Sequence, residues 1–197
     1  MNIIMSQLTL SDIITNLNII TDEDLSITSS TSTSSSTTNK INEYMDIIDT
    51  FYNKLTDDMI YKIIDIINRK SKISLRLIEW FVSKYTQNHI IEIYDINGLP
   101  MNIYNSYHIK TKIYEKKYFD LFRRVNVIQY KFKNKDDMII DTTISQLNFF
   151  KWLIENNIYY YIENNIDELI EIMSYNNALE RDNRKRKTLL HKKHHHK

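Results

Sequence analysis

Two segments rich in lysine and arginine hold the residues best suited to chemistry in this 197-residue chain. Residues 181–197 contain eight Lys and Arg against one acid, and residues 110–135 contain nine against two acids. The whole chain carries a net charge of only +1, so the remainder is acidic. Lys and Arg bind phosphates and release the counterions of nucleic acid. The residues expected to contact DNA or RNA are Lys110, Lys112, Lys116, Lys117, Arg123, Arg124, Arg184, Lys185, Arg186 and Lys187.

Each basic segment also has an interpretation without nucleic acid. In residues 110–135 the cations alternate with Tyr and Phe; exposed rings would suit single-stranded nucleic acid, whereas inward-facing rings would leave the cations as a solvated surface. In the tail, "RKRK" is typical of a nuclear-localisation or nucleic-acid patch, but a solubilising tail has the same composition. His191 and residues 194–196 could hold a metal ion weakly, but a tag remnant or an irregular run is the simpler explanation. No second ligand cluster with zinc spacing accompanies them, so we expect no metal site.

Enzymatic chemistry finds little support in the sequence. A chain whose only glycine is Gly98 cannot build the glycine-rich phosphate loops of nucleotide-binding folds. The motifs HExxH and GxSxG are absent, and there is no Cys to serve as a nucleophile or a metal ligand. His89 and His108 stand alone, and each is expected at the surface or at a helix end rather than as a general base. We therefore expect a non-enzymatic protein with no catalytic residues and no cofactor.

The composition is that of a very AT-rich genome. The chain has 34 Ile, 21 Asn, 19 Lys and 14 Tyr, all residues of A/T-dominated codons, but only one Gly and one Pro, Pro100. Asn must therefore take the turn and left-handed positions that Gly usually occupies. The absence of Cys excludes a disulfide framework and fits a reducing compartment.

The first 72 residues divide into two parts. Residues 1–40 are expected to be mostly disordered, with a possible short amphipathic helix at Ser6–Ile20 and a Ser/Thr-rich linker at Asp24–Lys40, which is either a plain spacer or a phosphorylation tract. Residues 41–72 show apolar residues at helical spacing, and Thr56 is a suitable cap for a second helix. We expect no secretory signal, since Met1–Asn18 has no basic start and no small-residue cleavage site, and no apolar run is long enough for a membrane span.

The elements over residues 73–176 predict an α+β core. A helix capped by Ser74 precedes two β-rich runs around Asn97-Gly98, the strongest short-range hairpin signal. Residues 105–124 are predicted to be mainly helical, and residues 125–143 form a second hairpin. The predicted fold is thus α+β, with two antiparallel β-hairpins packed with helices, preceded by an amphipathic helical segment and a disordered N-terminal linker. A basic, His-rich tail follows over residues 177–197.

The stretch "QLNFFKWLIENNIYYYIENN", residues 146–165, is expected at the centre of this core. Its apolar residues form two helical stripes, which indicates a helix buried on both sides. Asn is unfavourable within a helix, so one helix should end near Asn156 and another should run from about Ile158 to Tyr175. Buried aromatics at this spacing need no ligand, so we interpret them as core rather than as a stacking platform.

Three blocks of the sequence resemble a small protein family found in large nucleocytoplasmic DNA viruses of the Mimivirus type. They are "LIEWFVSKYTQ" at Leu77–Gln87, "YEKKYFDLFRR" at Tyr114–Arg124 and "TTISQLNFFKWLIENNIYYYIENN" at Thr142–Asn165. Where that family tends to read FDPFCRR this chain reads FDLFRR, and Ser145 stands where a Gly commonly precedes QLNFF. The resemblance implies a giant-virus protein and no specific activity.

Two main hypotheses for the function follow, and an enzyme with an unrecognised site is a third with less support. The first is a non-enzymatic giant-virus protein that binds DNA or RNA through residues 110–135 and 181–197. The second is a structural or adaptor protein that contacts other viral proteins through its acidic helical N-terminal half and its Ser/Thr linker. Either would act in the virus factory of the host cytoplasm or in the virion, without a membrane. The sequence does not indicate an oligomeric state.

Overall fold

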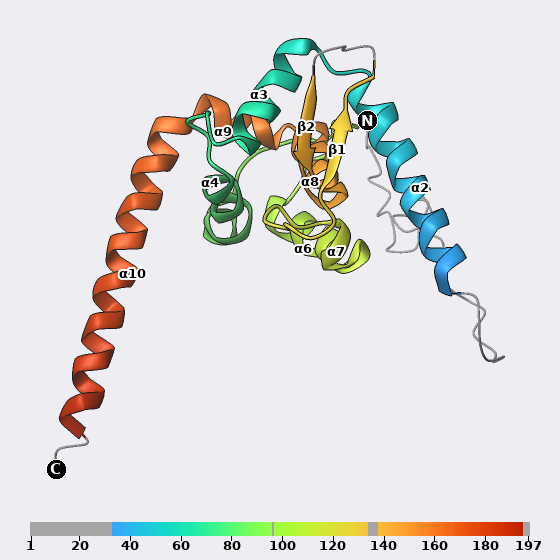
Figure 1. Ribbon diagram of the computed structural model, residues 1–197. Coiled ribbons are helices and arrows are strands. Elements are labelled where there is room, and N and C mark those ends of the chain that lie inside the picture. The colour runs from blue at the N-terminus through green and yellow to red at the C-terminus, as the bar shows by residue number, and fades with distance from the viewer. Residues whose placement is uncertain (1–32, 96, 134–137, 195–197) are drawn as a thin grey trace, which may run out of the picture. The chain divides into compact units, whose positions relative to one another are not determined.

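The computed structural model describes residues 33–95, 97–133 and 138–194 (Figure 1). The chain divides into two compact units, Met1–Thr37 and Thr38–Lys197; the described part of the first is the start of α2, and the second holds every other described element. In chain order the elements are α2 (Thr33–Tyr52), α3 (Asp57–Ile67), α4 (Leu75–Trp80), η1 (Phe81–Tyr85), α5 (Thr86–Asn88), α6 (Ile103–Ile113), α7 (Glu115–Tyr118), β1 (Ile128–Lys131), β2 (Ile139–Thr142), α8 (Ile144–Glu155), α9 (Ile158–Asn164) and α10 (Ile166–His194). The described chain is therefore mostly helical. Within it, no helix has the length and apolar content needed to cross a membrane.

The helices predicted between residues 41 and 90 are present. The Thr56 hydroxyl accepts the N–H of Met59 at 3.3 Å and caps α3, and the Ser74 hydroxyl accepts the N–H of Leu77 at 3.1 Å and caps α4. From α4 the helix continues through the π-helical turn η1 into α5. Residues 24–32 of the predicted Ser/Thr linker lie outside the described residues, but the linker prediction is wrong for residues 33–40, because the backbone is helical from Thr33. The short helix predicted at Ser6–Ile20 also lies outside the described residues.

One of the two predicted hairpins is confirmed. β1 and β2 pair antiparallel, with Ile128 opposite Thr142 and Lys131 opposite Ile139. Each strand alternates buried and more exposed residues, so one face of this two-stranded sheet turns toward the core. The predicted turn residues 134–137 lie outside the described part of the chain.

The other hairpin prediction, around Asn97 and Gly98, is wrong. The turn forms, because Gly98 adopts a φ of +75° that other residues rarely adopt. However, pairing beyond the turn is limited to an isolated bridge between Tyr94 and Pro100, flanked by hydrogen bonds from Asp95 N–H to the Leu99 carbonyl and from Met101 N–H to the Ile93 carbonyl, each 2.9 Å. Tyr94 and Pro100 form a non-hydrogen-bonded pair, so the Tyr94 carbonyl points away from Pro100 and accepts the side-chain amide of Asn157 at 3.1 Å. The fold therefore has a single two-stranded hairpin among the described residues.

Residues 105–124 are mainly helical, as predicted. The Asn102 side chain accepts the N–H of Asn105 at 2.8 Å and caps α6, and α7 follows after Tyr114. Residues 107–113 alternate in a pattern that on its own would suit a strand with one basic face, but they lie within α6. Local alternation was a weaker signal here than the spacing over the whole segment.

Asn residues end two successive helices. The predicted helix end at Asn156 is confirmed, but the helix predicted over 158–175 is interrupted at Asn165, where α9 stops and α10 begins. The two side-chain amides donate to carbonyls four residues earlier, those of Trp152 and Tyr161, at 2.8 Å each. Each of these carbonyls also accepts the backbone N–H of the same Asn at 3.2 Å, so the side-chain amide gives the carbonyl a second hydrogen bond at the helix end. The predicted tail boundary at residue 177 falls inside α10.

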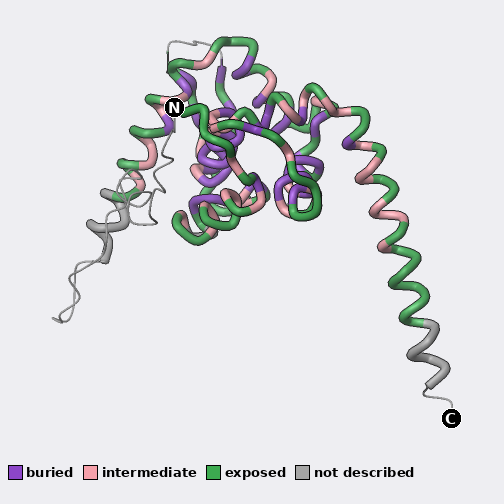
Figure 2. The backbone as a smooth tube through the Cα atoms, turned by 180° about the vertical axis from the view of Figure 1, so that it is seen from behind, coloured by how far each residue is buried: buried purple, intermediate pink, exposed green. Residues whose placement is uncertain are grey.

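α8 lies at the centre of the core, where Figure 2 shows the buried segments. Both predicted stripes are buried, among them Leu147, Phe150 and Phe149. The hydrophobic interpretation of this stretch is therefore confirmed, although near its end Tyr161 is half-buried and Tyr160 is 40% exposed.

Three buried polar residues of α8 fix the chain that follows α7. The Asn148 amide donates to the carbonyl of Tyr118 at 3.1 Å, and the Gln146 amide donates to that of Leu121 at 2.8 Å. Between them, the Ser145 hydroxyl donates to the carbonyl of Asp120 at 2.9 Å. Buried polar groups are costly without partners, so these bonds specify how residues 118–121 lie on α8. They also set the position of the basic residues that come next in the chain.

Candidate nucleic-acid interface

The cations predicted in the tail lie on α10 beyond the core. Arg184, Lys185, Arg186 and Lys187 are all exposed. Arg184 contacts Glu180 at 3.3 Å and Lys185 lies 3.9 Å from Asp182, whereas Arg186 and Lys187 have no ion-pair partner among the described residues. Successive helical residues point about 100° apart, so these four cations surround one turn of the helix. The arrangement offers positive charge in every direction around α10. The side chains of residues 189–197 are not described, so the predicted histidine run lies outside the described side chains.

The cations of residues 110–117 differ in their exposure and in their contacts. Lys110 is half-buried; burial, and then the nearby charge of Lys151, lowers its pKa, and its ammonium lies 5.5 Å from the centre of the Tyr114 ring. Lys112 is exposed, and being two residues further along α6 it points to nearly the opposite side of the helix. Lys117 is exposed and lies 5.0 Å from the Tyr118 ring centre. The side chain of Lys116 is outside the described residues.

Arg123 and Arg124 follow a turn after α7. The Asp120 carboxylate accepts the N–H of Phe122 at 2.9 Å, and the Asp120 carbonyl accepts that of Arg123 at 3.4 Å. Arg123 is half-buried and Arg124 is exposed. Both follow Leu121 closely in the chain. Because the Gln146 amide of α8 binds the Leu121 carbonyl, the core positions this pair.

The aromatic rings among these cations mostly face inward. Phe119, Tyr130 and Phe132 are at most 4% exposed, and Tyr118 is 6% exposed. In the described part of residues 110–135, Phe122 is the one exposed aromatic, at 45%. The rings therefore belong to the core, and this segment lacks the row of exposed rings on which successive bases stack.

The hairpin ties part of the basic segment to α2. The Tyr130 hydroxyl donates to one oxygen of Asp49 at 2.8 Å, and the Lys133 ammonium contacts the other at 2.5 Å. The hydrogen bond and charge of Asp49 raise the pKa of Lys133. Lys133 is thus committed to an acid of the same chain, while its neighbour on the same strand face, Lys131, is exposed without an ion-pair partner among the described residues.

Buried tyrosines predict a loss of stability in alkali. Burial raises the pKa of Tyr52, and burial followed by hydrogen bonds to Asp49 and Glu163 raises those of Tyr130 and Tyr159. Above about pH 10 the unfolded chain releases tyrosine protons that the folded chain keeps, so the folded state binds more protons. The free energy of unfolding should therefore fall as pH rises from about 10. Urea unfolding between about pH 8 and about pH 11.5 measures it, and a flat or rising stability would contradict the prediction.

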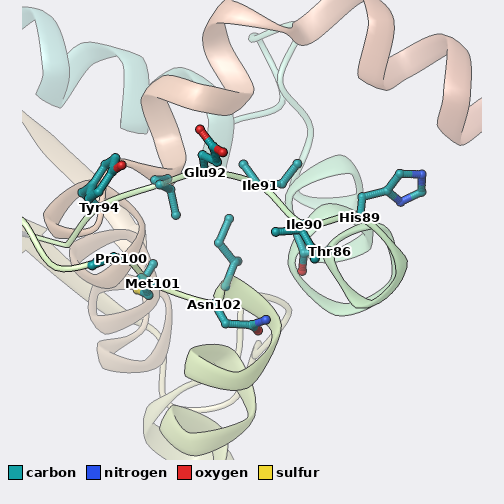
Figure 3. Close-up of a pocket in the computed structure, with 11 residues that line it drawn as sticks. Thr86, His89, Ile90, Ile91, Glu92, Tyr94, Pro100, Met101 and Asn102 are labelled. Atoms are coloured by element: carbon teal, nitrogen blue, oxygen red, sulfur yellow. The ribbon is translucent and has the colours of Figure 1, made fainter. Parts of the chain in front are cut away.

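A hollow of about 450 Å³ lined by Thr86, residues 89–94 and residues 100–103 offers no catalytic pair (Figure 3). The His89 ring stacks on Tyr85 with centroids 4.1 Å apart, and its Nδ1 lies 2.8 Å from the Tyr85 carbonyl. His89 is thus an exposed residue at a helix end, as predicted. The Thr86 hydroxyl donates to the carbonyl of Val82 at 3.0 Å, so it too is used locally.

A second hollow, of about 440 Å³, lies between α4 and α10 and holds three arginines. Two of them, Arg181 and Arg184, come from α10, and the third is Arg76 of α4. Sequence reasoning missed Arg76, since it stands more than a hundred positions from the basic tail and in no charged run. Only the packing of α10 against α4 brings these residues together.

Comparison with known proteins places the chain in a family. Residues 24–196 match the model of a family of unknown function, DUF7197. The chain belongs to DUF7197. This match includes residues 110–135, residues 181–196 of the basic tail and every described element, so the DUF7197 region is the whole fold described above together with the preceding linker from residue 24.

A viral relative agrees with the family. This DUF7197 chain is 38% identical over 105 residues to the uncharacterized protein L507 of Acanthamoeba polyphaga mimivirus. The aligned part covers 50% of this chain and 40% of L507, so the chain spans less than half the length of that relative. The resemblance to giant-virus proteins is thereby confirmed. No solved structure matches the DUF7197 chain.

Proposed function

We propose that this protein binds nucleic acid without catalysis, through the cations of α10 and with help from residues 110–135. The observation that carries the proposal is the turn of α10 at residues 184–187, where four consecutive cations are exposed on a regular helix. Two of the four have no acidic partner among the described residues, so their charge is available to phosphates.

The arrangement favours contact with the backbone over recognition of bases. Lys112 and Arg124 add exposed charge, but the rings of the same segment are mainly core residues. Phosphate contacts position a protein on nucleic acid without reading its sequence, and base stacking requires exposed rings. Binding should therefore be weakly dependent on sequence and strongly dependent on salt. The relationship to a mimivirus protein supports a role during infection, in the virus factory or in the virion.

Titration of the protein into labelled single-stranded DNA, duplex DNA and single-stranded RNA tests the proposal. Fluorescence anisotropy at several salt concentrations gives the slope of log affinity against log salt. Each phosphate neutralised on duplex DNA contributes about −0.9 to that slope, so four or more contacts should give a slope of about −3.6 or steeper. The absence of binding to all three nucleic acids at low salt would contradict the proposal.

A protein–protein adaptor is the second candidate, because α10 also exposes apolar side chains. Tyr175 is 68% exposed and Leu179 is 50% exposed, and residues four apart lie on one side of a helix. Exposed apolar side chains of this kind suit a partner surface. If no nucleic acid binds, and if a viral protein co-purifies from infected cells with wild type but not with Leu179→Asp, the adaptor is favoured.

A further inference from the structure

The hollow between α4 and α10 is a groove with converging polar groups. Four of its residues, Ser174, Asn177, Arg181 and Arg184, follow one another on α10 at spacings of three, four and three. This spacing places them along one side of the helix. Arg76, an exposed residue, faces them from the first turn of α4. The groove therefore gathers three guanidinium groups, a hydroxyl and an amide from two elements.

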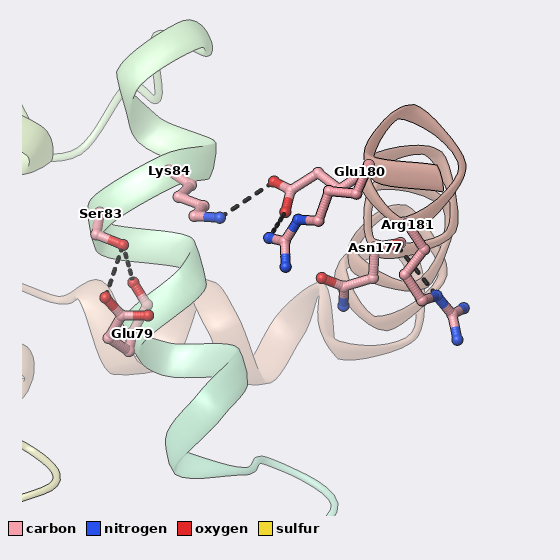
Figure 4. A network of polar contacts seen from close by, with 7 residues as sticks. Glu79, Ser83, Lys84, Asn177, Glu180 and Arg181 are labelled. Atoms are coloured by element: carbon pink, nitrogen blue, oxygen red, sulfur yellow. Dashed lines mark hydrogen bonds and ion pairs between the residues drawn. The ribbon is translucent and has the colours of Figure 1, made fainter. Parts of the chain in front are cut away.

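Glu180 fixes part of this arrangement. Its carboxylate accepts one bond from Lys84 at 3.1 Å and a second from Arg184 at 3.3 Å, and Figure 4 shows Lys84 and Glu180 pointing toward each other between the helices. The hydrogen bond and charge of Lys84, and then those of Arg184, lower the pKa of Glu180. Glu180 therefore stays ionised at neutral pH. It joins α10 to η1 and holds Arg184 at the groove.

The groove keeps a positive surplus after its acid is counted. Lys84 offsets the charge of Glu180, so the three arginines remain in excess. The Arg181 Nε donates to the Asn177 carbonyl at 3.3 Å. Because a carbonyl has no net charge, this bond does not neutralise the charge of Arg181. Arg76 has no hydrogen-bond or ion-pair partner for its side chain among the described residues. Guanidinium groups that converge in excess of their acid, here Glu180, match the charge and the planar, bidentate geometry of phosphate.

From this geometry we infer that the α4–α10 groove binds a backbone phosphate of nucleic acid. The inference rests on the proposed function and extends it, because Arg184 belongs both to the groove and to the exposed basic turn. The helix from Asn177 to Lys187 is about 15 Å long, and one strand of a duplex places a phosphate about every 3.4 Å along its axis. One strand that follows α10 would thus present about four phosphates, the first of them in the groove between Arg76 and Arg181.

The test is a single substitution in α4, outside the basic tail, that replaces a charged side chain with an uncharged one. Arg76→Gln should weaken binding of a labelled oligonucleotide about tenfold at low salt and reduce the salt slope by about one, because one charge-assisted phosphate contact is lost. Arg76→Lys keeps the charge but loses the planar guanidinium, so its affinity should lie between those of wild type and Arg76→Gln. Lys54→Gln removes the same charge from an exposed site on another element and should change affinity less than about twofold. A thermal melt confirms that each variant folds.

Each outcome separates the groove from the wider proposal. If wild type binds and Arg76→Gln behaves as Lys54→Gln does, the groove inference is overturned and the proposed function stands. If wild type binds none of the oligonucleotides, the proposed function fails and the groove inference fails with it. Inorganic phosphate provides a separate arm, followed through the Arg76 side-chain resonance by NMR. A response to phosphate without oligonucleotide binding would show an anion site and would overturn nucleic acid as its source.

Discussion

Replacing Phe149 with alanine is expected to lower the free energy of unfolding by about 3–5 kcal/mol. Phe149 is 1% exposed, and its ring lies 4.9 Å from that of Phe119, 5.5 Å from that of Trp152 and 6.1 Å from that of Tyr107, measured between centroids. Truncation removes the transfer free energy of the ring and leaves a cavity that these fixed neighbours cannot fill. Urea unfolding followed by circular dichroism measures the loss.

The neighbours of Phe149 explain why the effect should be large. Tyr107 belongs to α6 and Phe119 follows α7, so the ring joins these segments to α8. Tyr160→Ala is a suitable control in the same aromatic stretch, since Tyr160 is 40% exposed and should cost less than about 1 kcal/mol. A loss of less than about 1 kcal/mol for Phe149→Ala would mean that Phe149 is not a core residue. A similar loss for both variants would contradict the assignment of Phe149 to the core and of Tyr160 to the surface.

The core was predictable from sequence because its signal is local. Helical spacing in the stretch around Phe149 identified two buried faces, and the caps Thr56 and Ser74 marked true helix starts. These features depend on residues within a few positions of one another, which a linear pattern records. The hairpin prediction near Gly98 failed because the Asn-Gly signal marks the turn, which does form, but does not record that pairing on either side stops at a single bridge.

The charged surface was less predictable than the core. Composition located both basic segments but could not separate the half-buried Lys110 from the exposed Lys112 two positions away. It also could not show that Lys133 is engaged by Asp49, because that contact joins the hairpin to α2. Arg76 carried no sequence signal at all, since its proposed role exists only after α10 packs on α4. Charge runs therefore indicate where binding is plausible, and tertiary contacts decide which cations remain available.

Changing Arg184, Lys185, Arg186 and Lys187 together to glutamine is expected to weaken nucleic-acid binding about a hundredfold or more at low salt. The change removes up to four phosphate contacts, so the slope of log affinity against log salt should become shallower by about 3–4. Gln has nearly the same helix propensity as Lys and Arg, and all four positions are exposed, so α10 should keep its helical structure. Fluorescence anisotropy measures binding, and circular dichroism verifies the helix.

A charge-preserving variant separates electrostatic binding from specific geometry. Arg184→Lys combined with Arg186→Lys keeps all four charges and should bind within about threefold of wild type if the turn contacts phosphates mainly through charge. A loss as large as that of the glutamine variant would instead show that the guanidinium groups recognise a particular structure. Wild-type affinity in the glutamine variant would remove α10 from the interface. Residues 110–135, whose exposed cations include Lys112 and Arg124, would then have to supply the binding charge.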